Sequence, residues 1–317
     1  MRVLVTGIGG QTGSYFAEKA IARGWECVGL VRSRDQIENG LPTEVRTVEA
    51  DLLDLEGVAR AVRDERPDTI VNLAGLSSVA ASWQQPVETA SINGLAVANL
   101  LATVSQLKDD GHPCQFIQAS SAEIFGAAVD AIQSEASPLA PMNPYGASKA
   151  YGHVLVGAYR ATGVRAVSAI LYNHESPRRP SAFVTRKITQ GAVEIALGRQ
   201  EYLALGNLDA ARDWGWAPDV AEALVLMVEA RSSEDFVVAT GRAHTVREFA
   251  EAALTAAGLS DVSTLLRVDP RFQRPSDAPT LVGDSTRLRD TLGWKPTVTF
   301  EQIVEAMVAE DFRLARA

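Results

Sequence analysis

The first residues of the chain restrict its fold more than any other stretch. A short β-branched run at 2–6 leads into a turn whose three glycines have a G-x-x-G-x-x-G spacing, and a helical pattern extends over 14–23. A strand, a glycine-rich turn and a helix form a dinucleotide-binding unit, because backbone N–H groups at the helix N-terminus receive a pyrophosphate. A tight turn without a ligand is the alternative. The predicted cofactor contacts in this turn are Gly7, Gly10, Gln11, Thr12 and Gly13.

Apolar strands alternate with helices through the first half of the chain. Strands are predicted at 26–31, 45–53, 69–74, 114–119 and 167–172, and helices at 55–65, at 87–107 and from Tyr145 onward. Because such alternation is typical of parallel sheets covered on both faces, the fold class is α/β, a Rossmann-type doubly wound parallel sheet. Residues 1–172 are predicted to form the cofactor domain, with 213–240 returning to it. Residues 173–317 mainly form a smaller, interleaved α/β C-terminal substrate domain.

The first part of this second domain has a different composition. The segment 173–214 is polar and cationic, and its pattern shows no clear strands. We interpret it as an irregular surface that faces a ligand, and not as a second packed sheet.

The end of the second strand indicates which dinucleotide is bound. The strand 26–31 ends on Arg32, about 20 residues after the glycines, where an acidic residue would bind the 2′-hydroxyl of NAD and a cation would accept the extra phosphate of NADP. Arginine therefore favours NADP, and a solvated charge at a strand end is the alternative. Further cofactor contacts are predicted at strand ends, at Asp51, Leu52, Leu73 and Ala74.

Candidate catalytic residues follow the strand 114–119 and open the next helix. Tyr145 and Lys149 are spaced i, i+4, so on a helix they lie on one face. A free tyrosine has a pKa of about 10, so it acts as a base near neutral pH only if a neighbouring cation stabilises its phenolate. We expect Lys149 to be that cation, with an oxidised nicotinamide as a second positive charge. A partly exposed helix face is the alternative, since this spacing alone is common.

Composition excludes several classes of partner. The net charge of −9 and the pI near 5.1 argue against nucleic acid, so an anionic ligand must meet a local cluster of arginines. Cys27 and Cys114 lie in apolar runs and are predicted as core residues, and no metal site is predicted. The chain has no unbroken run of about 18 apolar residues, and its N-terminus enters a strand directly. We therefore expect a cytoplasmic protein without a membrane partner.

On these residues the chain resembles the extended short-chain dehydrogenase/reductase superfamily over nearly its full length. Within it, the chain is most similar to the GDP-mannose 4,6-dehydratase family. Four long polar strings carry the finer resemblance, at 173–179, 183–188, 206–215 and 268–275. The resemblance implies four catalytic residues, of which the first replaces the family's threonine: Ser121, Glu123, Tyr145 and Lys149.

The resemblance also implies the reaction. Tyr145 would take the proton of the sugar 4-hydroxyl as hydride passes from C4 to NADP, and Ser121 would bind the 4-oxygen. The 4-ketone acidifies C5–H, so Glu123 would take that proton and deliver one to the departing 6-hydroxyl. The hydride then returns to C6. Contacts with the GDP-sugar are implied at Asn173, Val184, Lys187, Gly206, Arg212, Arg274 and Asp277.

Some residues depart from the family pattern and keep other functions open. Ala122 lacks a hydroxyl that the family has, and Gly75-Leu76-Ser77 differs at the sugar side. The segment after Arg32 is shorter than the family's, which argues against a tetramer and leaves a homodimer as the expected assembly. His174 is expected to be structural. The alternatives are a GDP-sugar 4-epimerase or 4-ketoreductase and, more remotely, a non-catalytic NADP-binding regulatory protein.

Overall fold

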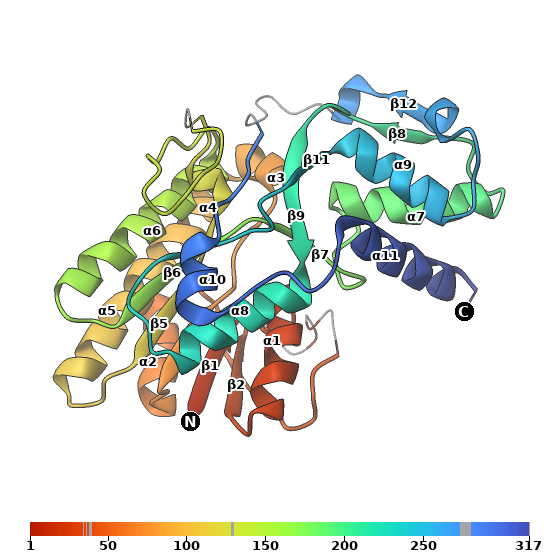
Figure 1. Cartoon of the computed structure of the whole chain (residues 1–317). Coiled ribbons are helices and arrows are strands. Elements are labelled where there is room, and N and C mark those ends of the chain that lie inside the picture. Colours follow the sequence, from red (N-terminus) through yellow and green to blue (C-terminus); the bar gives the residue numbers. More distant parts are fainter. Residues whose placement is uncertain (34, 36, 38–39, 128–129, 273–279, 317) are drawn as a thin grey trace.

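A parallel sheet forms the centre of the larger lobe (Figure 1). In the computed structural model, which describes residues 1–33, 35, 37, 40–127, 130–272 and 280–316, the sheet has seven strands. Its strand order is β10 (Phe236–Val238), β6 (Ala166–Leu171), β5 (Gln115–Ser121), β4 (Thr69–Asn72), β1 (Arg2–Thr6), β2 (Glu26–Val31) and β3 (Arg46–Glu49). Every neighbouring pair is parallel, which confirms the predicted fold class.

Helices cover both faces of this sheet. One face packs against α1 (Gln11–Ala22), α8 (Ala217–Glu229) and α10 (Thr286–Leu292), through a core that includes Phe16 and Leu224. The other face packs against α2 (Leu55–Glu65), α5 (Ala96–Asp109) and α6 (Pro144–Ala161), through Val62, Leu100 and Val156. Both predicted core cysteines are buried and free, and burial raises the pKa of each thiol to about 12.

Several strands differ in length from their predictions, and two of the differences bear on the site. The strand predicted at 45–53 is only Arg46–Glu49, because Asp51 turns the chain by accepting from Leu53 N at 2.9 Å and Asp54 caps α2. The strand predicted at 114–119 continues to Ser121, which pairs with Leu171. Ser121 is therefore fixed on the sheet edge and not on a loop.

The helix predicted at 87–107 is divided into three parts. It consists of α4 (Pro86–Ala90), a π turn η2 (Ser91–Leu95) and α5, preceded by the short helix α3 (Val79–Gln84). Among the described residues, the stretch Pro86–Asp109 is long and apolar enough to cross a bilayer, with a mean hydropathy of 1.3, although half of its apolar window is buried in the protein. Such a core helix is weak evidence for a membrane, so the absence of a membrane partner stays a prediction.

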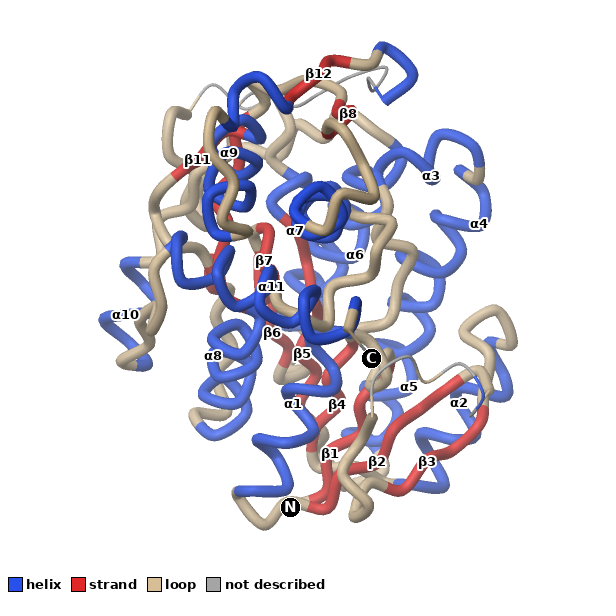
Figure 2. The backbone as a smooth tube through the Cα atoms, turned by 90° about the vertical axis from the view of Figure 1, so that its right-hand side faces the viewer, coloured by secondary structure: helices blue, strands red, loops and turns tan. Residues whose placement is uncertain are grey.

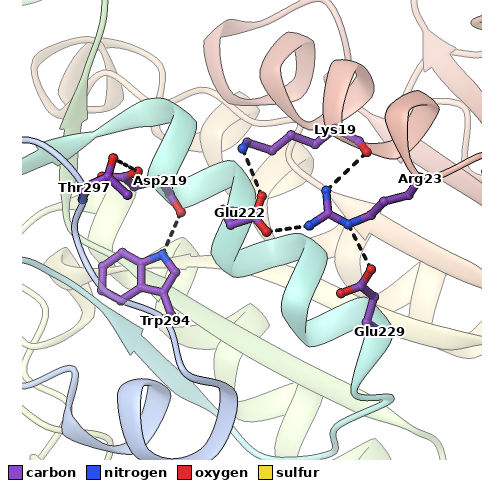
Figure 3. Close-up of polar contacts among 7 residues, drawn as sticks. All are labelled: Lys19, Arg23, Asp219, Glu222, Glu229, Trp294 and Thr297. Carbon is purple, nitrogen blue, oxygen red and sulfur yellow. Dashed lines mark hydrogen bonds and ion pairs between the residues drawn. The ribbon is translucent and has the colours of Figure 1, made fainter.

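Segments from the second half of the chain return to the larger lobe. Figure 3 shows α8 beside α1, where Lys19 Nζ contacts Glu222 at 2.9 Å and Arg23 contacts both Glu222 and Glu229. On the other side of α8, the Asp219 carboxylate accepts from Thr297 N at 2.8 Å and from its hydroxyl at 2.6 Å. The residues that return to the larger lobe therefore include α10 and the segment up to Thr297, and extend beyond the predicted 213–240.

The smaller lobe is more regular than the sequence indicated. Its strands are β7 (Asn173–Glu175), β8 (Leu203–Leu205), β9 (Ala211–Trp216), β11 (Ala243–Thr245) and β12 (Leu266–Val268). Its helices are α7 (Val184–Ala196), α9 (Val246–Ala256) and α11 (Phe300–Ala315) (Figure 1 and Figure 2), with the short turns η4 (Val262–Leu265) and η5 (Pro270–Phe272). The prediction of an irregular segment at 173–214 was wrong, because its apolar residues Ile188, Val193, Leu205 and Trp214 pack with α9 and α11 in a second core.

A buried ion pair holds α11 on α7. Arg186 Nη2 lies 2.8 Å from Asp311 Oδ1, and the two side chains are 5% and 3% exposed. Burial raises the pKa of Asp311, although a hydrogen bond from Thr189 and the charge of Arg186 oppose that shift.

Truncation of Asp311 should destabilise the smaller lobe. The Asp311→Ala variant leaves the Arg186 charge buried without its partner, so we expect a loss of about 3 kcal/mol in the free energy of unfolding. Glu310→Ala, which removes a partner of the exposed Arg313, is the control and should cost less than about 1 kcal/mol. Urea unfolding measures the free energy of unfolding of both variants. Equal unfolding midpoints for Asp311→Ala and Glu310→Ala would show that the buried pair does not hold the lobe.

Candidate active site

One large cavity lies at the carboxyl ends of the parallel strands. It has a volume of about 1100 Å³ and is lined from both lobes. Ligands of open α/β sheets bind at this edge, where the loops after the strands leave a crevice. A cavity for one drug-sized ligand is roughly 300–1,000 Å³. The volume of this cavity lies just above that range, so we expect it to hold more than one small ligand.

The glycine turn forms one end of the cavity. Gly7 has φ +66°, and a Cβ there would lie 2.7 Å from Ala74 N; a Cβ at Gly13 would lie 2.3 Å from Gly7 O. These two glycines therefore allow β1, β4 and α1 to approach closely. Gly10 is the N-cap of α1 and supplies no side-chain cap, so the first N–H groups of the helix face the cavity. An anion suits that position.

The polar side-chain atoms of Gln11 and Thr12, which line the cavity, are bonded to β7 and to Ser176 directly after it. Gln11 Nε2 donates to His174 O at 2.9 Å, and its Oε1 accepts from the Ser176 hydroxyl at 2.8 Å. Thr12 Oγ1 lies 2.8 Å from His174 Nε2, and His174 Nδ1 lies 2.8 Å from Tyr172 O. If these residues bind a cofactor, they do so through backbone N–H groups.

The same contacts give His174 a structural position. Burial lowers the pKa of His174 to about 4, so the imidazole is neutral near pH 7. A neutral ring can donate from Nδ1 to the Tyr172 carbonyl and accept at Nε2 from the Thr12 hydroxyl. The ring thus connects the glycine turn to β7.

Tyr145, Lys149 and Ser121 meet at the centre of the cavity wall. Asn143 caps α6, so Tyr145 and Lys149 occupy its first two turns, and the Lys149 ammonium lies 5.9 Å from the Tyr145 ring centroid. Lys149 Nζ donates to Ala119 O at 2.9 Å, and the Ser121 side chain lies close enough to the Tyr145 hydroxyl to lower its pKa. All three side chains line the cavity.

In the protein alone, Lys149 does not turn Tyr145 into a base. Burial raises the pKa of Tyr145 to about 12, more than the Ser121 hydrogen bond and the charge of Arg179 lower it. Burial also lowers the pKa of Lys149 to about 8. Burial of the Tyr145 charge therefore outweighs these contacts in the protein without a cofactor. That Lys149 and an oxidised nicotinamide together stabilise the phenolate stays a prediction.

Glu123 reaches the same part of the cavity. It belongs to the short turn η3 (Ala122–Ile124) directly after β5, and Glu123 N donates to Ser121 Oγ at 3.3 Å. Its carboxylate accepts from Asn143 Nδ2 at 2.8 Å, and its charge raises the pKa of Tyr145. A carboxylate and a phenol thus share one cavity wall, where two different protons can be moved.

The cofactor and substrate residues predicted from the sequence line the cavity where the structure describes them. On the glycine side these are Gly7, Gly10, Gln11, Thr12, Gly13, Arg32, Asp51, Leu52, Leu73 and Ala74. On the side of the smaller lobe these are Asn173, Val184, Lys187, Gly206 and Arg212. Lys187 Nζ donates to Ala204 O at 3.0 Å and lies 3.2 Å from the Phe272 ring centroid. Arg274 and Asp277 lie outside the described residues.

Sequence reasoning missed Arg179 as a site residue. Its guanidinium lies over the Phe183 ring at 3.7 Å, contacts the buried Glu175 at 3.1 Å and lines the cavity. Its neighbour Arg178 turns away, stacks on Tyr15 and contacts α1. The polar string 173–179 was recognised, but nothing in the sequence indicates which of two adjacent arginines faces inward. Arg271 lines the cavity and Asn143 donates to the Glu123 carboxylate, and neither residue was predicted as part of the site.

Comparisons with known proteins agree with this geometry. The sequence profile of a family described as GDP-mannose 4,6 dehydratase matches residues 4–307. GDP-mannose 4,6 dehydratase 2 of Arabidopsis thaliana is 40% identical over 99% of this chain and 87% of its own length. Two solved structures are similar to this protein, and each match covers 98% of this chain and 99% of the other chain. They are Thermus thermophilus UDP-glucose 4-epimerase in complex with NAD, at 30% identity and a TM-score of 0.84, and RMD from Pseudomonas aeruginosa complexed with NADPH, at 26% and 0.81. The chain belongs to the GDP-mannose 4,6-dehydratase family.

Proposed function

We propose that this protein is a nucleotide-sugar 4,6-dehydratase that converts GDP-mannose to its 4-keto-6-deoxy product. The observation that carries this proposal is the Glu123 carboxylate, which lies in the same cavity wall as Tyr145 and Lys149. Oxidation at C4 needs only a base for the 4-hydroxyl. Loss of water from C5 and C6 needs a second group that takes a proton from carbon, and Glu123 supplies it.

The roles of the residues follow from their positions. Tyr145 accepts the proton of the 4-hydroxyl, and Ser121, which lines the same cavity, orients the same oxygen. Lys149 is close enough to favour the phenolate once further positive charge enters the cavity. Glu123 takes the C5 proton and returns one to the departing 6-hydroxyl, so water leaves without a net change of protons on the protein.

The cavity also fits a dinucleotide. The uncapped N-terminus of α1 and the backbone approach at Gly7 suit a pyrophosphate, and Ser120 Oγ, buried in the wall, has no hydrogen-bond partner among the described residues. A bound nicotinamide would take the hydride from C4 and return it to C6, and its positive charge would favour the Tyr145 phenolate. The residues that would hold the phosphates and the nicotinamide ribose are Gly10, Gln11, Thr12, Tyr145 and Lys149.

Product mass tests the function directly. The purified protein is incubated with GDP-mannose, and the mass of the nucleotide sugar is measured by mass spectrometry. Loss of one water supports dehydration, whereas a product of unchanged mass would indicate a 4-epimerase. The epimerase is kept as the second candidate because a solved UDP-glucose 4-epimerase has the same fold over nearly the whole chain.

We infer that the cofactor is NADP. Arg32 and Ser33 line the cavity directly after β2, at the position where the ribose of a dinucleotide lies. Arg32→Ala should weaken NADP binding by about tenfold or more and change NAD binding little, because NAD lacks the 2′-phosphate that the guanidinium would bind. Titration calorimetry with each cofactor measures both, and Ser14→Ala on α1 serves as a neighbouring control. Equal losses for the two cofactors would place the 2′-phosphate elsewhere.

We further propose that two copies associate in the cytoplasm through α4, η2 and α6. Exposed apolar side chains gather on these helices, with Val87 at 78%, Leu95 at 52% and Val154 at 56% exposure. These helices lie side by side in the structure. Exposed apolar side chains on adjacent helices suit an interaction site. Sedimentation of the purified protein at micromolar concentration distinguishes a dimer from a monomer.

A further inference from the structure

The side-chain amide of Asn143 makes two contacts at the entrance to the catalytic helix. Its Oδ1 accepts from Gly146 N at 2.8 Å, which caps α6. Its Nδ2 donates to Glu123 Oε2, also at 2.8 Å. Asn143 is 5% exposed, so neither contact competes with bulk water. One rigid planar group therefore joins the helix that carries Tyr145 and Lys149 to the carboxylate at the end of β5.

Only asparagine can make both contacts from this position. Serine, aspartate and asparagine are about equally good N-caps, because each offers a side-chain oxygen to the first free N–H groups. An aspartate has no donor for a neighbouring carboxylate, and a serine hydroxyl that caps the helix is shorter than the amide. The cap alone thus does not require an amide at 143.

We propose that Asn143 is a positioning residue for the elimination step, which holds the Glu123 carboxylate in place for the proton on C5 of the sugar. This inference rests on the proposed dehydratase function. Because Oε2 is held by Asn143, the oxygen that takes the C5 proton is Oε1, and the same Oε1–H then protonates the leaving 6-hydroxyl. The C5–H bond breaks as the proton moves to Oε1, and its electron pair forms the C5=C6 double bond. The C6–O bond breaks as that proton leaves with water.

The surroundings of Glu123 make the amide contact important. The titratable and charged groups that line the cavity on this side are Tyr145 and Lys149 from α6, Glu175 from β7 and Arg179 from the loop that follows β7. Arg179 contacts Glu175, and the Lys149 ammonium donates to Ala119 O. Among the described residues, the Glu123 carboxylate accepts a hydrogen bond from the neutral side-chain amide of Asn143.

Two matched variants separate the cap from the contact with Glu123. Asn143→Ser and Asn143→Asp both keep a cap, so their thermal midpoints should stay within about 2 °C of the wild type. Asn143→Ser should lower the rate of dehydration about tenfold, and Asn143→Asp about a hundredfold, since a second carboxylate beside Glu123 opposes its ionisation. Asn99→Ser, which removes an amide that bonds to Leu55 O outside the cavity, should change nothing.

The pH profile and a step comparison give readouts that a structural role would not move. The acidic limb of the profile should move upward by roughly one pH unit in Asn143→Ser and further in Asn143→Asp. Formation of reduced nicotinamide in a single turnover, which precedes elimination, should change much less than product formation. Equal losses in both steps, with an unmoved acidic limb, would overturn the proposal.

A measurement without substrate keeps this test independent of the function. Glutamate labelled with ¹³C at the carboxyl carbon is titrated by NMR in the wild type and in both variants, with the Glu123 signal assigned by its absence from Glu123→Gln. The Glu123 midpoint should rise in both variants. An unchanged midpoint refutes the role of Asn143, whereas a shifted midpoint in a protein that does not dehydrate GDP-mannose refutes the proposed function instead.

Discussion

Replacement of Glu123 by glutamine is expected to lower the rate of dehydration by about 10³- to 10⁴-fold. Glutamine has the same shape and can still accept from Asn143 Nδ2, so the wall of the cavity should keep its geometry. It cannot take a proton from C5. Hydride transfer from C4 uses Tyr145 and not Glu123, so reduced nicotinamide should still form when the variant meets the substrate.

Two measurements check this result. Mass spectrometry follows the loss of water, and the absorbance of reduced nicotinamide in a single turnover follows oxidation at C4. Glu305→Gln, an exposed position on α11, is the matched control and should behave as the wild type. Dehydration at the wild-type rate in Glu123→Gln would remove this carboxylate from the mechanism and leave the epimerase as the better assignment.

Replacement of Lys149 by methionine is expected to have two opposite effects. Activity should fall by at least about 10³-fold, because the phenolate of Tyr145 loses the cation beside it. The protein without cofactor should become more stable by about 1–3 kcal/mol, because a buried charge is replaced by an apolar chain of similar length. Lys149 is 5% exposed, and burial lowers its pKa to about 8.

The sign of the pH dependence follows from that pKa. In the unfolded chain the pKa of lysine is about 10.4, so between pH 8 and 10.4 the unfolded state binds more protons than the folded state. The contribution of Lys149 to the free energy of unfolding therefore rises with pH through that window. Below pH 8 the full cost of burying the ammonium is present. The advantage of Lys149→Met should be largest at pH 7 and should shrink by pH 9.5.

Urea unfolding of both proteins at the two pH values measures this difference. The comparison removes the contribution of other groups that titrate in the same range, because both proteins contain them. If Lys149→Met were less stable than the wild type at pH 7, the ammonium would be stabilised by its contact with Ala119 O more than burial destabilises it. An advantage that stays constant with pH would show that Lys149 is not the group that titrates.

Much of the fold could be predicted because it depends on local pattern. The glycine turn after residues 2–6 and the alternation of strands with helices indicated the parallel sheet, which the structure confirms. The part of the second core within 173–214 was missed, because the apolar residues of α7 and β9 pack against α9 and α11, which lie far along the chain. Composition averaged over 173–214 therefore looked irregular.

The site was predicted in part for the same reason. Tyr145 and Lys149 are one helical turn apart, so spacing alone placed them together, and Ser121 and Glu123 follow one strand end. The inward position of Arg179, the neutral state of His174 and the contact of Asn143 with Glu123 depend on atoms that approach from distant segments. No pattern within a short window carries that information.

The sequence by itself determined the fold class, the family resemblance and the types of residue available for the chemistry, because periodicity and motif spacing are properties of neighbouring residues. Only the tertiary structure decided the protonation of those residues. Burial raises the pKa of Tyr145 to about 12 and lowers that of Lys149 to about 8, since removing a charge from water costs more than the contacts within this cavity return. How much water reaches a side chain depends on every segment packed around it.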